Sequence, residues 1–153
     1  MRFGLATLLS LSGDVDLAAR LLAVEFDPIS PGIATARPGE PVLAGMPVGE
    51  AVFVEAVRVA RANVVSWKDE FVHGCAVGVM ANLAPYLGDM RTSVAQRLVG
   101  LCVTVGKMLG RGGPAADELA VVYLGLLAVL NGCLEGEAGG GARSLGCRGS
   151  VLI

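Results

Sequence analysis

The stretch FVHGCAVGVMANLAP, residues 71–85, decides the fold class of this chain. Its apolar residues recur at a helical spacing of i, i+3, i+4, i+7 and i+11, and Leu87, just after the stretch, adds i+15. The set is Val72, Cys75, Ala76, Val79, Leu83 and Leu87. An α-helix of 3.6 residues per turn places this set on one face. A second face carries small residues and Asn82, and there another backbone can approach closely. We therefore predict a helix over 68–84, which Pro85 ends.

The flanking sequence repeats the helical pattern. It predicts further helices over 3–11, 14–26, 49–65, 89–110 and 116–134. Asp14 and Asp89 are expected N-caps, because a carboxylate there accepts hydrogen bonds from the free N–H groups of the first turn. Five of the 7 prolines fall within 27–48, a density that no regular helix or central strand tolerates. No alternation typical of a strand is present in the sequence.

The chain thus divides into four predicted segments. These are short N-terminal helices over 1–26, a Pro/Gly-rich loop over 27–48, a helical core over 49–134 and a disordered Gly-rich tail over 135–153. The predicted fold is all-α, with antiparallel helical hairpins that stack on their sequence neighbours as an α-solenoid segment of the armadillo or HEAT kind. One hairpin is expected to turn through 85–89, where Pro85 and Gly88 interrupt the helical pattern.

The composition excludes a general role in nucleic-acid binding. Twelve Lys and Arg residues are scattered among 14 acidic ones, for a net charge of −2. Nucleic-acid binders instead cluster their basic residues to displace counterions. Charged residues make up 17 % of the chain and hydrophobic residues 54 %, against about 25 % charged in a typical soluble domain. A chain this apolar is expected to have protein partners.

The sequence offers no catalytic, cofactor-binding or metal-binding constellation. His73 is the single histidine, and Cys75 lies on a different side of the same helix, so the two cannot form a nucleophile–base pair. No C-x-x-C pair is present, and a zinc site is therefore not supported. We expect a protein that is not an enzyme and holds no cofactor or metal.

The polar residues of the helices have structural interpretations. His73 is expected to be partly buried with its hydrogen bonds satisfied. Asn82 disfavours a helix interior, so we expect it to bond to an adjacent helix or loop. Arg97, next to Gln96, is expected to form a solvated or inter-helical ion pair.

The last predicted helix carries the candidate interaction surface. Residues 119–134 contain no charged side chain, and a helix without a polar face is internal or in lipid. A spanning helix needs about 20 apolar residues, so we favour a core helix. Its outer patch is expected to remain exposed and to promote self-association, with Val121, Leu124, Ala128 and Val129 as its members. The alternative is a small membrane-associated protein with 119–134 inserted in lipid.

Four separated blocks together resemble the dymeclin family. The helix FVHGCAVGVMANLAP (71–85) resembles the family pattern Leu-His-x-x-Cys-Leu-Ala-x-Leu-Ala-Asn-Met, and VAQRLVGL (94–101) resembles its Ala-Ser-Gln-Arg-Leu block. Val-Arg-x-x-x-x-Asn-Val (57–64) and Leu-Asn-Gly-Cys-Leu (130–134) are similar to two more family blocks. The blocks keep the family order, and the resemblance covers about 49–134. His73, Asn82, Gln96 and Arg97 belong to the matching blocks.

The resemblance implies a function without catalysis. Dymeclins are longer, all-helical proteins associated with Golgi organisation and intracellular trafficking. A member of this family is expected to be cytoplasmic, Golgi-associated and in peripheral contact with the membrane. The resemblance also leads us to expect that the chain is a fragment, or a truncated and divergent member, because Met1 would fall well inside the family sequence.

Overall fold

A computed structural model describes residues 2–25, 45–87, 90–113 and 115–143. Over these residues the fold is all-α, as predicted, and contains no strand. Most of the predicted loop, together with Asp89 and the last ten residues of the predicted tail, lies outside the described residues.

Two short helices lead into the core. They are α1 (Arg2–Ser12) and α2 (Val15–Ala23). Asp14 caps α2 as predicted, since its carboxylate accepts from the backbone N–H groups of Asp16 and Leu17 at 3.0 and 3.1 Å. Only one side of α1 is covered, because Leu5 is buried whereas Phe3 is 91 % exposed.

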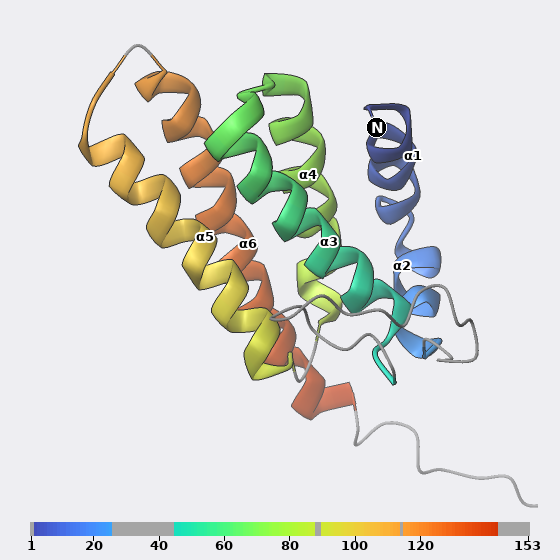
Figure 1. The fold of residues 1–153 in the computed structure, drawn as a ribbon. Coiled ribbons are helices and arrows are strands. Elements are labelled where there is room, and N and C mark those ends of the chain that lie inside the picture. The colour runs from blue at the N-terminus through green and yellow to red at the C-terminus, as the bar shows by residue number, and fades with distance from the viewer. Residues whose placement is uncertain (1, 26–44, 88–89, 114, 144–153) are drawn as a thin grey trace, which may run out of the picture.

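The core consists of two antiparallel hairpins that lie side by side (Figure 1). In the first, α3 (Val48–Ala62) is followed by the π-helical turn η1 (Asn63–Trp67) and by α4 (Glu70–Leu83). In the second, α5 (Thr92–Gly110) is followed by α6 (Ala116–Arg143). In Figure 1, α3 and α5 run in one direction and lie beside each other, while α4 and α6 run in the other direction.

The predicted hairpin between α4 and α5 is wrong. The helices that pair are α3 with α4 and α5 with α6, whereas α4 and α5 form no such pair. After α4 the chain enters a 3-10 turn, η2 (Ala84–Tyr86), and α6 covers this turn. A Cβ on Gly132 of α6 would lie 3.3 Å from the Cβ of Ala84, so α6 packs closely against η2 at this glycine.

Two predicted helix ends also differ from the structure. α5 begins at Thr92 rather than at Asp89, and its cap position, Arg91, makes no capping hydrogen bond through its side chain. Arg91 instead pairs with the buried carboxylate of Glu50, with Nε and Oε2 3.5 Å apart, which fixes the start of α5 against the start of α3. α6 continues to Arg143, so 135–143 are helical where a disordered tail was predicted. Glycine is a weak helix former, which is why the sequence pattern placed the end too early.

The hydrophobic core lies between the two hairpins. The largest fully buried side chains come from α3, α4, α5, α6 and the segment before α3, and include Phe53, Met46, Met80, Leu83, Leu98, Leu101 and Leu126. The small-residue face of α4 is where α1 packs, because a Cβ on Gly78 would lie 2.6 Å from Cδ1 of Leu9. Similarly, a Cβ on Gly125 would lie 2.6 Å from Cγ1 of Val77, so this glycine permits the close approach of α6 to α4.

Candidate functional site

The outer face of α6 is strongly apolar and exposed. Val121 is 71 % exposed, Leu124 is 65 % exposed and Leu134 is 64 % exposed. We call this surface the α6 outer face and define it by these exposed residues: Val121, Leu124, Leu127, Ala128 and Leu134. Leu127 and Leu134 were not among the predicted members.

One predicted member of the surface is misplaced. Val129 is fully buried, together with Leu126 on the same side of α6, and packs in the core. Successive residues of a helix are separated by about 100°, so Ala128 and Val129 cannot both lie at the centre of one face. In a helix that is apolar all round, the sequence pattern alone cannot tell which side faces the core.

α6 is long and apolar enough to cross a membrane. The segment Ala116–Glu135 has 20 residues and is the candidate span within the described part of the chain. Core helices of soluble proteins can have the same length and apolar composition.

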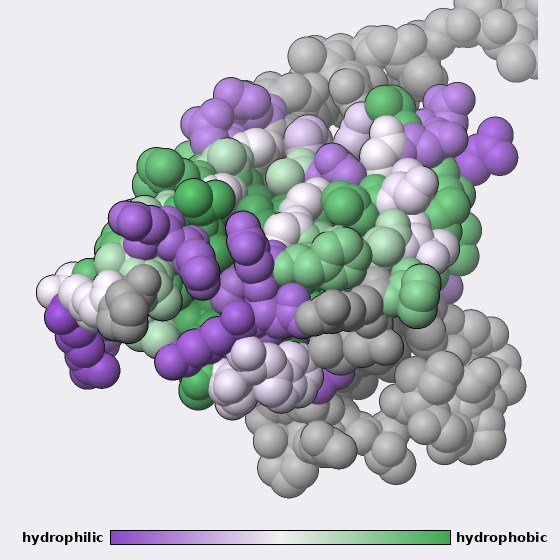
Figure 2. Space-filling model, turned by 90° about the horizontal axis from the view of Figure 1, so that it is seen from above, coloured by the Kyte–Doolittle hydropathy of each residue, from purple (hydrophilic) through white to green (hydrophobic). Residues whose placement is uncertain are grey.

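Figure 2, which views the molecule from above, shows hydrophobic side chains at the surface beside a group of hydrophilic ones.

The four predicted motif residues do not form one site. His73 and Asn82 lie on α4, nine residues apart, which corresponds to about 13 Å along a helix. Gln96 is exposed and Arg97 is half-buried, and both lie on α5, which does not pair with α4. The motif residues therefore lie in different parts of the fold.

Asn82 connects α4 to α1, as predicted for a bond to a neighbouring helix. Its Nδ2 donates to Oγ of the buried Ser12 at 3.1 Å and to the carbonyl oxygen of Leu9 at 3.4 Å. Asn82 itself is half-buried.

We expect Asn82→Ala to lower the free energy of unfolding by about 1–2 kcal/mol, because the Ser12 hydroxyl loses a partner. Urea unfolding followed by circular dichroism measures this change. Asn131→Ala is the control, since its amide donates only to the exposed Glu135 within one helix, and it should cost less than about 0.5 kcal/mol. Equal costs for the two variants would contradict the role of Asn82.

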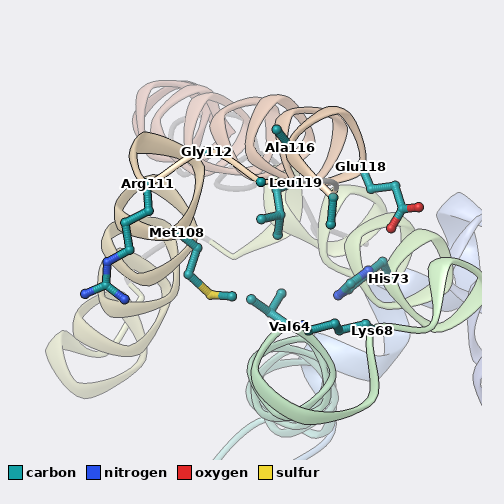
Figure 3. A pocket seen from close by; sticks show the side chains of 11 residues that line it. Val64, Lys68, His73, Met108, Arg111, Gly112, Ala116, Glu118 and Leu119 are labelled. Carbon is teal, nitrogen blue, oxygen red and sulfur yellow. The ribbon is translucent and has the colours of Figure 1, made fainter.

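His73 lines a pocket at the end of the core where the two hairpin connections lie (Figure 3). The pocket has a volume of about 230 Å³ and lies between η1, the start of α4, the end of α5 and the start of α6. The imidazole of His73 points into it, as does the side chain of Met108, whereas the guanidinium of Arg111 points away. His73 is only 6 % exposed, and its Nε2 has no hydrogen-bond partner in the structure. The prediction that its hydrogen bonds are satisfied is therefore wrong.

One side of the His73 pocket is formed by η1 and Lys68, a turn that the sequence patterns did not predict. η1 is a π-helix, and Lys68 follows it in the left-handed region with φ of 51°. The fully buried Asn63 closes this turn, since its Nδ2 donates to the carbonyl oxygen of Asp69 at 2.7 Å and its Oδ1 accepts from the Asp69 N–H at 3.1 Å. π-helical turns occur often at functional sites. Asn63, which belongs to the 57–64 block, was the one residue in the sequence that pointed to this turn.

Burial lowers the pKa of His73 below its ordinary value of 6.5, and the carboxylates of Glu118 and Asp69 oppose this shift only in part. A histidine with a lowered pKa in the folded state binds its proton more readily in the unfolded chain. The free energy of unfolding should therefore decrease as the pH falls from 7.5 to 5.5, by at most about 1.4 kcal/mol per pH unit from this group.

Urea unfolding across this pH range tests the expectation. His73→Leu should remove the contribution, so its stability should vary less with pH than that of the wild type. An identical pH dependence in both proteins would contradict the assignment to His73.

The cysteines of the core show no sign of reactivity. Cys75, Cys102 and Cys133 are buried, and no disulfide joins any two of them. Burial raises the pKa of the Cys75 and Cys102 thiols, which disfavours the nucleophilic thiolate. Within the described residues no group of His, Cys, Asp and Glu side chains could hold a metal ion.

Comparison with known proteins identifies the family. The model of the family described as "Dymeclin: Dyggve-Melchior-Clausen syndrome protein" matches residues 1–109, which is more than half of the chain. The chain belongs to the dymeclin family. No curated protein and no solved structure matches it.

The family match and the resemblance in the sequence cover different ranges. The match includes α1, α2 and the Pro/Gly-rich segment, whereas the resemblance began at about residue 49. The family match ends near the end of α5 and does not include α6. The α6 outer face therefore lies outside the matched range of this dymeclin chain.

Proposed function

We propose that this dymeclin chain is a non-catalytic scaffold segment that binds other proteins during Golgi organisation and intracellular trafficking. The observation that carries the proposal is the α6 outer face, an exposed apolar surface on a folded helix of a dymeclin-family chain. Large exposed apolar patches on soluble proteins mark interaction sites. Cytoplasmic location and peripheral association with the Golgi are part of the same proposal.

Side-by-side hairpins are also what an α-solenoid requires. In such repeats each hairpin contacts its neighbours, and the last one exposes an apolar side unless a further repeat covers it. The contacts of α3 with α5 and of α4 with α6 agree with this arrangement. We propose that the α6 outer face is the side on which a further helical element docks.

Localisation in cells tests the proposal. The tagged full chain should co-localise with a Golgi marker, and Val121→Lys with Leu124→Lys should reduce this co-localisation at equal expression. Val15→Lys with Val24→Lys is the matched control, because these valines are 61 % and 57 % exposed on the distant α2 side. Diffuse cytosolic staining of the wild type, or an equal loss in both variants, would contradict the proposal.

The second candidate is a membrane-associated protein with 119–134 in lipid, which the apolar length of Ala116–Glu135 favours. Insertion would remove Leu126 and Val129 from the core, where both are now fully buried. Carbonate extraction of membranes separates the two functions, because a peripheral protein is released and an inserted one is retained.

A further inference from the structure

A buried polar atom without a partner is the most unusual feature of the His73 pocket. Nε2 of His73 makes no hydrogen bond although the side chain is almost completely buried, and the ring points into the pocket (Figure 3). An unpaired buried polar group costs free energy, and most such groups in native proteins have a partner. The pocket therefore holds a position where a hydrogen-bonding ligand atom would be stabilised.

Apart from Lys68, Arg111 and Glu118, the rest of the lining is apolar and favours an apolar ligand. Val64, Met108 and Leu119 surround the space next to the imidazole, and Ala115 and Ala116 complete it at the start of α6. A cavity of about 150 Å³ with an apolar lining is large enough for benzene. The volume of about 230 Å³ thus accommodates one aromatic ring with a small substituent.

The carboxylates near His73 disfavour an anionic ligand beside its imidazole. Lys68 and Arg111 belong to the lining, but Arg111 points away and Glu118 brings a negative charge close to His73. A neutral imidazole has one donor and one acceptor nitrogen. A hydroxyl group can donate or accept, so it pairs with Nε2 in either tautomer.

We propose that this pocket binds a small, neutral, largely apolar molecule with one hydroxyl group, which hydrogen-bonds to Nε2 of His73. A phenol with a short alkyl substituent is the simplest molecule of this class. The site lies at the hairpin connections, and it does not depend on the role proposed for the α6 outer face.

The experiment compares two probes that differ in one group. 4-Methylphenol carries the hydroxyl, and p-xylene replaces it with a methyl group of similar size. Calorimetric titration of the full chain gives both dissociation constants for the wild type and for His73→Leu. This variant is expected to fold, because it removes an unpaired polar atom, and circular dichroism checks that it does.

The relative affinity for 4-methylphenol over p-xylene should decrease at least tenfold in His73→Leu. Ala116→Leu should weaken both probes because it fills the pocket, whereas Ala128→Leu, the same change on the α6 outer face, should leave both unchanged. No saturable binding to the wild type, or the same relative affinity in His73→Leu, would overturn the proposal. Weakened binding in Ala128→Leu would also overturn it, since the probes would then lie on the outer face.

Discussion

Val129→Lys is expected to cost at least about 4 kcal/mol in the free energy of unfolding, a large part of the stability of a typical domain. Val129 is fully buried in the core between the hairpins, and lysine there would bury an unpaired charge or force α6 away from its neighbours. Typical domains have only about 5–15 kcal/mol of stability in total.

Ala128→Lys is the matched control for this variant. Ala128 precedes Val129 on the same helix but is exposed, so the same new side chain should change stability by less than about 0.5 kcal/mol. Thermal and urea unfolding by circular dichroism measures both variants. Similar behaviour of the two would mean that α6 does not pack on the core as the structure places it.

Val129 and Ala128 also show that the sequence pattern was not sufficient to orient α6. Helical periodicity predicted the existence of each helix correctly, because a spacing of three and four residues depends only on local geometry. The orientation of α6 about its own axis depends on which neighbours it meets. With apolar residues on every side, nothing in the sequence distinguished Val129 from Ala128.

The pairing of helices was likewise not predictable from local pattern. α4 carries one apolar face and one small-residue face, either of which could receive a following helix. In the structure α1 takes the small-residue face at Gly78, and α6 reaches α4 through Gly125. These partners are distant in sequence, so the prediction that neighbouring helices pair failed for α4 and α5.

The predictions of individual polar residues succeeded for one local cap and for one bond between helices. Asp14 caps α2 through the N–H groups of its first turn, and Asn82 bonds to α1 as predicted. His73 differs because its surroundings come from four elements between Val64 and Leu119. A pocket assembled from such distant segments leaves no signal in the spacing of one helix.

The second large effect concerns association. We expect the wild-type chain to self-associate at micromolar concentration and to bind a hydrophobic dye, because the α6 outer face exposes several large apolar side chains along one helix. Val121→Lys with Leu124→Lys should shift it to monomer in sedimentation velocity and reduce dye binding several-fold. Both residues are more than half exposed, so the fold should persist.

A control variant tests whether association depends on the α6 outer face or on exposed apolar residues in general. Val15→Lys with Val24→Lys adds the same charge on exposed valines of the α2 region and should leave the association state unchanged. Because both double variants add two positive charges, a difference between them cannot arise from net charge alone. If both double variants lose association, the cause is overall charge rather than the α6 outer face. A wild-type chain that sediments as a monomer and binds no dye would contradict the proposal that this face interacts.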